Sequence, residues 1–225
     1  VHDARRNAFA LLSELDLLEH PGAAGLLDSL DEQTRSVTAT MIEHGINSPR
    51  TSSMGRLFDA AAAILGICGQ ATYEGEPAIE LEAAAWRAFD SEIARFPDDS
   101  AGYSASDPSW LDGPYVLDQK ALFEALLEEI EAGASADRLA LDFHVAVARS
   151  SAHIASDICV REGIDTVALS GGVFMNRLLL QLLTRELKSA GLAVLVPHTV
   201  PVNDGCIAYG QAAVASARLA QIASQ

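Results

Sequence analysis

Apolar residues recur every three or four positions along most of the chain, a spacing that buries one face of an α-helix. The pattern predicts helices at residues 5–18, 23–30, 31–44, 55–66, 78–96, 117–130, 135–161, 178–187 and 206–220. Glycines follow several of these segments, as expected where a helix ends in the left-handed conformation. Most of the fold is therefore expected to be helical.

Two short apolar runs break the helical pattern, at residues 166–169 and 193–196. They flank the helix at 178–187, so we expect two parallel strands joined by a right-handed crossover. The segment 97–114 is loop-like, with a possible edge strand at 102–105. Two strands rarely form a stable sheet, so either the fold is mainly helical or further strands lie outside this chain.

Polar residues and glycines follow both predicted strands. In open α/β sheets ligands bind beyond the carboxyl ends of the strands. Gly171-Gly172 and then Asn176 follow the first strand, and Asp204 follows the second. These groups are candidates for an anion or nucleotide site, because a glycine turn lets the backbone approach a ligand closely. Alternatively, the glycines form only a tight turn and Asp204 only begins a helix.

Asp59 is unusual because it lies on a helix whose other residues are mostly apolar or alanine. It either has a binding role, or it points to solvent or pairs with Arg56 three residues earlier. The charged side chains of the helix at 78–96, including Glu82, are typical of a solvated face. No His-x-x-x-His pair occurs, and lone histidines such as His144 are more often structural or surface residues than ligands.

Composition narrows the possible partners. The 225 residues form one large domain or two small ones. A net charge of −16 disfavours binding to nucleic acid, and no apolar run approaches the ~18 residues of a membrane span. Three separated cysteines suit a reducing compartment. We therefore expect a cytoplasmic protein with neither a nucleic-acid nor a membrane partner.

Four linked motifs carry a family resemblance. They are SMGRLFDA at 53–60, YEG at 73–75, LSGGVFMNR at 169–177 and PVNDGCIAYGQA at 201–212. In this order, and with the helix at 143–162, they resemble the C-terminal end of the hydrogenase-maturation carbamoyltransferases, the HypF family. The resemblance covers nearly the whole chain.

The resemblance implies an α/β fold, the C-terminal part of an actin-like, sugar-kinase-like ATPase fold. It would be helix-rich with a small parallel βαβ sheet. Residues 1–135 would form a helical portion with the nucleotide-site helix, and residues 136–225 an α/β portion with the glycine turn. Family members also carry an upstream half with a His-x-x-x-His pair and an adenylate-forming domain. We expect that half to lie outside this sequence, so this chain alone would be inactive.

The resemblance also implies a reaction. Carbamoyl phosphate and ATP would give carbamoyl adenylate. The carbamoyl group would then pass to the C-terminal cysteine thiol of a hydrogenase-maturation partner protein, on the way to the cyanide ligands of a nickel–iron hydrogenase. The alternatives are a relative of the enzymes that make threonylcarbamoyl-adenosine on tRNA, and a non-catalytic helical interaction module.

The resemblance assigns roles to six residues. The expected nucleotide-binding residues are Asp59, Gly75, Gly171, Gly172 and Asn176. Asp204 is expected to bind one divalent metal ion, iron or zinc, shared with the upstream histidine pair, while Mg²⁺ would accompany ATP. Glu76 departs from the pattern, because it stands where the tRNA enzymes have a second glycine.

Overall fold

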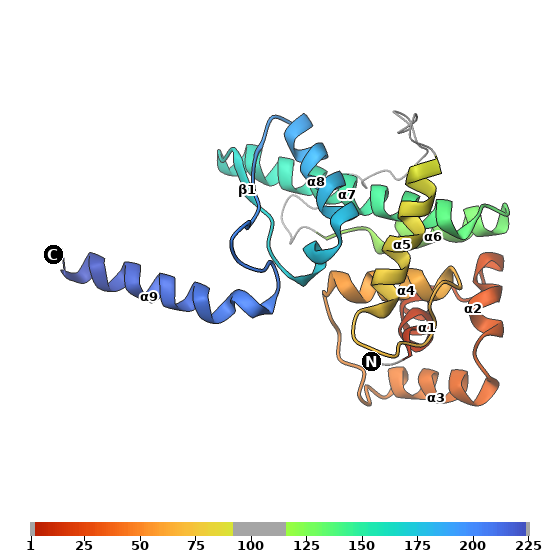
Figure 1. Ribbon diagram of the computed structural model, residues 1–225. Helices are drawn as coiled ribbons and strands as arrows, with labels where there is room; N and C mark the ends of the chain where they lie inside the picture. The colour runs from red at the N-terminus through yellow and green to blue at the C-terminus, as the bar shows by residue number, and fades with distance from the viewer. Residues whose placement is uncertain (1–2, 92–115, 224–225) are drawn as a thin grey trace.

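A computed structural model describes residues 3–91 and 116–223 (Figure 1). Its α-helices are α1 (Ala4–Glu14), α2 (Ala24–Asp28), α3 (Glu32–Glu43), α4 (Met54–Ile64), α5 (Glu76–Ser91), α6 (Gln119–Glu131), α7 (Ala136–Glu162), α8 (Arg177–Ser189) and α9 (Ile207–Ala223). Three 3-10 helices join them: η1 (Pro21–Ala23), η2 (Gly172–Met175) and η3 (Asp204–Cys206). The strands are β1 (Thr166–Ala168) and β2 (Ala193–Leu195). The edge strand predicted at 102–105 lies outside the described residues.

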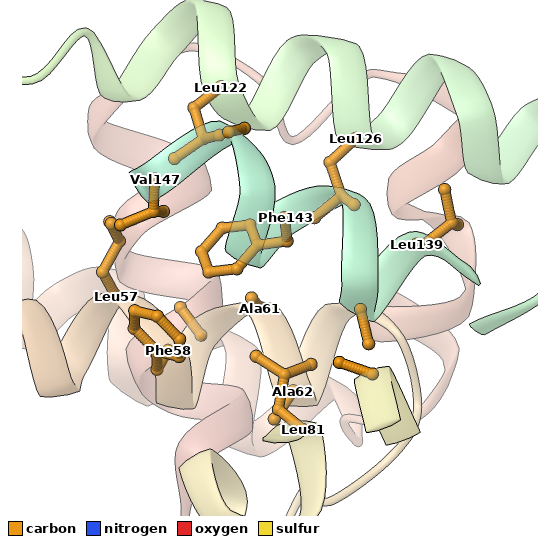
Figure 2. Close-up of a cluster of buried hydrophobic side chains, with 14 of the residues drawn as sticks. Leu57, Phe58, Ala61, Ala62, Leu81, Leu122, Leu126, Leu139, Phe143 and Val147 are labelled. Atoms are coloured by element: carbon orange, nitrogen blue, oxygen red, sulfur yellow. The ribbon is translucent and has the colours of Figure 1, made fainter. Parts of the chain in front are cut away.

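The core forms where α4, α5, α6 and α7 pack together. Phe58 of α4 and Phe143 of α7 meet edge to face, with ring centroids 5.3 Å apart. Figure 2 shows aliphatic side chains of α4, α5, α6 and α7 packed around these two rings. The alanines of α4 are almost completely buried, which lets neighbouring backbones approach closely. The same cluster extends to the leucines of α8, so both predicted portions of the chain contribute to one core.

The helix predicted at 5–18 differs from α1 at both ends. Asp3 caps its N-terminus, with its carboxylate accepting the N–H of Arg5 at 3.1 Å. At the other end Asp16 has a φ of 59°, which ends the helix four residues before the predicted position. The N–H of Leu17 turns back to the carbonyl of Leu12 at 2.8 Å, and Leu17 is buried. The apolar spacing continues past the helix because Leu17 packs from a turn.

The long helix α7 follows its prediction closely. The hydroxyl of Ser135 accepts the N–H of Arg138 at its start, and Gly163 ends it with a φ of 67°. The helix α7 packs against both α5 and α8. This helix therefore links the helical core to the part of the chain that carries the sheet.

The two strands are parallel and hydrogen-bonded, with Val167 opposite Val194. The helix α8 connects them, and it packs against α7 with most of its leucines buried. The fold is thus helix-rich with a small parallel βαβ unit, as predicted. Among the described residues, no helix is both long and apolar enough to cross a membrane.

Candidate functional site

The glycine turn lies at the carboxyl end of β1. Gly171 has a φ of 118°, a conformation that a residue with a Cβ rarely adopts. Its N–H donates to the carbonyl of Val202 at 2.8 Å, so this N–H already has a partner within the chain. The hydrogen bond joins the turn to the loop that follows β2, and Gly172 then begins η2.

Asn176 occupies the position between η2 and α8. Its Oδ1 accepts the N–H of Leu179 at 2.8 Å and caps the N-terminus of α8. Its Nδ2 lies 2.8 Å from Nε2 of His144, a buried side chain on α7. Both ends of the amide are therefore held, one by α8 and the other by α7.

Asp204 is the first residue of η3, which follows β2 and its loop at the same edge as the glycine turn. The cap of η3 is its neighbour Asn203, whose Oδ1 accepts the N–H of Gly205 at 3.1 Å. Nδ2 of Asn203 donates to Sδ of Met175 in η2 at 3.3 Å. This bond and the Gly171–Val202 bond connect the two loops. The carboxylate of Asp204 is exposed to solvent.

Asp59 is 4% exposed, although it carries a charge. Its Oδ2 pairs with Nη1 of Arg56 at 2.8 Å, which confirms the pairing expected three residues apart. Burial raises the pKa of Asp59, and the positive charge of Arg56 opposes that shift. The helix α4 that carries Asp59 contacts η2. Phe58, the residue before Asp59, packs edge to face on His144, with ring centroids 5.0 Å apart.

Gly75 precedes α5 with a φ of 83°, so a turn that requires glycine is present there. The next residue, Glu76, folds back, and its carboxylate accepts both the backbone N–H and the hydroxyl of Thr72. These hydrogen bonds lower the pKa of Glu76. Glu76 therefore closes the turn with its side chain, at the position where the tRNA enzymes have a second glycine.

Sequence reasoning missed two polar residues that hold this region together. Glu82 was expected on a solvated face, but its Oε1 accepts the N–H groups of Arg177 at 2.8 Å and Leu178 at 3.2 Å. The indole of Trp86 donates to the same oxygen at 3.2 Å. His144 was treated as a lone histidine, yet it is fully buried and bonded to Asn176. Nothing in the spacing of either residue marks a partner 32 or 95 positions away.

The metal prediction rests on Asp204 alone. Over residues 3–91 and 116–223, no group of three or more His, Cys, Asp or Glu side chains could hold a metal ion. A single exposed carboxylate suits one ligand position of an iron or zinc site, but a stable site needs about four ligands. The residues present thus fit a partial set of ligands, and the role of Asp204 stays a prediction.

Comparison with known proteins defines the class. Residues 1–211 match the family described as "Carbamoyltransferase, Kae1-like Domain, second subdomain". A carbamoyltransferase HypF homolog from Cupriavidus necator is 41% identical over 188 residues, which are 82% of this chain and 45% of that protein. A more distant relative, the tRNA N6-adenosine threonylcarbamoyltransferase of Clostridium botulinum, is 28% identical over 75% of this chain and 46% of its own length.

The structural comparison agrees with this class. A crystal structure of full-length HypF in the phosphate- and nucleotide-bound form superposes with a TM-score of 0.80, at 28% sequence identity. The match covers 97% of this chain and 27% of that one. The chain belongs to the HypF carbamoyltransferase family. It spans less than half the length of these relatives.

Proposed function

We propose that this chain is the part of a HypF carbamoyltransferase that binds carbamoyl adenylate, within an enzyme that acts in nickel–iron hydrogenase maturation. The main support is the convergence of the Gly171–Gly172 turn, Asn176 and the Asp204 loop at one edge of the βαβ unit, in a chain of this family. A family member of known structure was crystallised with phosphate and nucleotide. This observation favours an enzyme over a helical interaction module.

In the proposed reaction, the full-length protein forms carbamoyl adenylate from carbamoyl phosphate, ATP and water, with Mg²⁺ accompanying the ATP. The phosphate of carbamoyl phosphate and the pyrophosphate of ATP are released in this step. The cysteine sulfur of the partner protein attacks the carbamoyl carbon. A carbon–sulfur bond forms, the bond from that carbon to the AMP phosphate oxygen breaks, and AMP leaves. The thiol proton passes to solvent or to a base outside this chain.

The residues of this chain would mainly bind and orient the adenylate. The carboxylate of Asp59 can accept hydrogen bonds from ribose hydroxyls. The Gly75 and Gly171–Gly172 turns leave room for the nucleotide beside the backbone, and Asn176 offers an amide. Burial disfavours the charged form of Asp59 and raises its pKa, and a hydrogen-bond donor from the ligand would offset that effect.

Asp204 would supply one ligand to an iron or zinc ion, and the remaining ligands would be a histidine pair upstream of this chain. When bound, such an ion polarises a carbonyl or phosphate oxygen. Asp204 is exposed, and the residue that caps η3 is its neighbour Asn203. Replacing it should therefore leave the structure intact.

Mass spectrometry of the partner protein tests this proposal. The full-length protein, supplied with carbamoyl phosphate, ATP and a partner ending in cysteine, should add a carbamoyl group to that cysteine. Asp204→Ala should abolish the transfer and remove about one metal ion per protein. Glu19 is also an exposed carboxylate, but it lies far from Asp204 in the sequence. The matched control Glu19→Ala should change neither the transfer nor the metal content. Intact transfer with equal metal content in the Asp204 variant would show that Asp204 only begins a helix.

A further inference from the structure

The imidazole of His144 is 0% exposed, and both of its nitrogens have partners. Nδ1 lies 2.7 Å from the carbonyl oxygen of Ala140, and Nε2 lies 2.8 Å from Nδ2 of Asn176. A carbonyl only accepts, so Nδ1 must carry the proton. An amide nitrogen only donates, so Nε2 must be the acceptor. The contacts therefore select one neutral tautomer.

Electrostatics agree with this assignment. Burial lowers the pKa of His144 to about 4, so the ring is neutral near pH 7. A protonated ring would place an N–H against the N–H of Asn176 and break the pair. The edge-to-face packing with Phe58 of α4 is a third contact that holds the ring.

The same contacts fix the orientation of the Asn176 amide. Its Oδ1 must face Leu179, because that backbone group donates at 2.8 Å. Its Nδ2 must then face His144. Of the two amide N–H groups and two oxygen lone pairs, these bonds use one of each. One N–H and one lone pair are left for a ligand, in directions set by the partners.

The backbone at the start of α8 is already engaged. The carboxylate of Glu82 accepts the N–H groups of Arg177 and Leu178, and Asn176 accepts that of Leu179. The first turn of a helix often binds phosphate through such groups, but here a carboxylate holds that position. A nucleotide that meets this edge would thus meet the amide of Asn176 and not the N–H groups of α8.

We propose that His144 is a positioning residue that holds the amide of Asn176 so that its second N–H is presented to an acceptor atom of the adenosine nucleotide. This inference rests on the proposed function, because it needs a nucleotide at Asn176. The competing explanation is that His144 only fills space beside Phe58. A double-mutant cycle separates the two, because a positioning residue loses its effect when the residue it positions is removed.

The experiment measures binding of AMP to the full-length protein by calorimetry. His144→Phe keeps a ring against Phe58 but removes the acceptor, and it should raise the Kd ~10-fold, the cost of about one hydrogen bond. Asn176→Ala should raise it by at least as much. The double variant should bind no more weakly than Asn176→Ala alone. His144→Gln, which keeps an acceptor, should restore binding to within ~3-fold of the wild type.

Additive losses in the double variant would overturn the proposal, as would unchanged binding by His144→Phe. Nitrogen-15 NMR of the wild-type imidazole gives a second measurement should the Phe variant not fold. It should show a protonated Nδ1 and an unprotonated Nε2, and the Nε2 signal should move in Asn176→Ala. A protonated Nε2 would overturn the proposal. Failure of the wild type to bind AMP would overturn the proposed function as well, whereas binding with an additive cycle would overturn only the role of His144.

Discussion

The helices α4 and α9 show how differently two parts of this chain are packed. Every residue of α4 from Leu57 to Ile64 is buried, including the charged Asp59. By contrast, residues 207–221 of α9 are all exposed, and Figure 1 shows that helix extending away from the rest of the fold. Asp59 therefore belongs to the packed core, and the partly buried Asn176 is held by its hydrogen bonds to Leu179 and His144. Asp204, just before α9, belongs to an exposed segment and is held only through the loop.

The largest expected effect of this contrast is on stability. Phe143→Ala should lower the free energy of unfolding by about 3–5 kcal/mol, because it removes a fully buried ring that contacts Phe58 and Phe123. Leu219→Ala in α9 is the control, and it should change the value by less than about 0.5 kcal/mol, since Leu219 is 67% exposed. Denaturant titration of the 225-residue chain compares the two. Equal losses would show that α9 is packed as tightly as the core where Phe143 of α7 meets Phe58 of α4.

A second effect concerns pH and the buried histidine. In the unfolded chain His144 binds a proton near its ordinary pKa of 6.5, but in the fold its pKa is about 4. The unfolded state thus binds more protons, so stability falls as pH drops from about 6.5 to about 4, by about 3 kcal/mol. The raised pKa of Asp59 acts in the opposite direction at the acidic end of this range.

Denaturant titrations at several pH values measure the slope of the free energy of unfolding against pH. His144→Gln should flatten it between pH 6.5 and 5, because glutamine does not titrate. Val160 is an exposed, non-titrating residue of the same helix, and the control variant Val160→Ala should leave the slope unchanged. An identical slope in wild type and His144→Gln would mean that His144 is not held neutral.

A smaller effect is expected at the start of α8. Glu82→Ala should cost about 1–2 kcal/mol of stability, because two backbone N–H groups and the indole of Trp86 lose their acceptor. Glu80 lies on the same helix but is exposed, so Glu80→Ala should cost less than about 0.5 kcal/mol. Thermal unfolding of the two variants makes the comparison. Equal shifts in Tm for the two variants would show that Glu82 does not stabilise the start of α8.

Periodicity predicted the helices well where local signals agree. Ser135 and Gly163 bound α7 as expected, because a cap and a left-handed glycine act within one helical turn. The βαβ unit also followed from two apolar runs and the helix between them. The predicted end of α1 was wrong. Leu17 lies in the turn after the helix but is buried, so the apolar spacing continues beyond the last helical residue.

The candidate site was predictable only in part. Its motif residues stand out as glycines and as polar groups at strand ends, and the Asp59–Arg56 pair follows from helical spacing. His144 and Glu82 do not stand out, because each looks like an ordinary member of its helix. Their roles arise when α5 and α7 pack against α8. The spacing of residues along the chain does not predict that packing.

The central claim is that this chain binds an adenosine nucleotide beside the Gly171–Gly172 turn and Asn176, and Asp59 of the neighbouring helix α4 tests it most directly. Calorimetric titration of the full-length protein with AMP measures the binding free energy. For Asp59→Ala it should be less favourable by about 1–3 kcal/mol, the cost of losing hydrogen bonds to a charged group. Glu19→Ala should bind like the wild type, because that carboxylate is exposed and distant along the chain. Wild-type affinity in a folded Asp59→Ala protein would contradict the account.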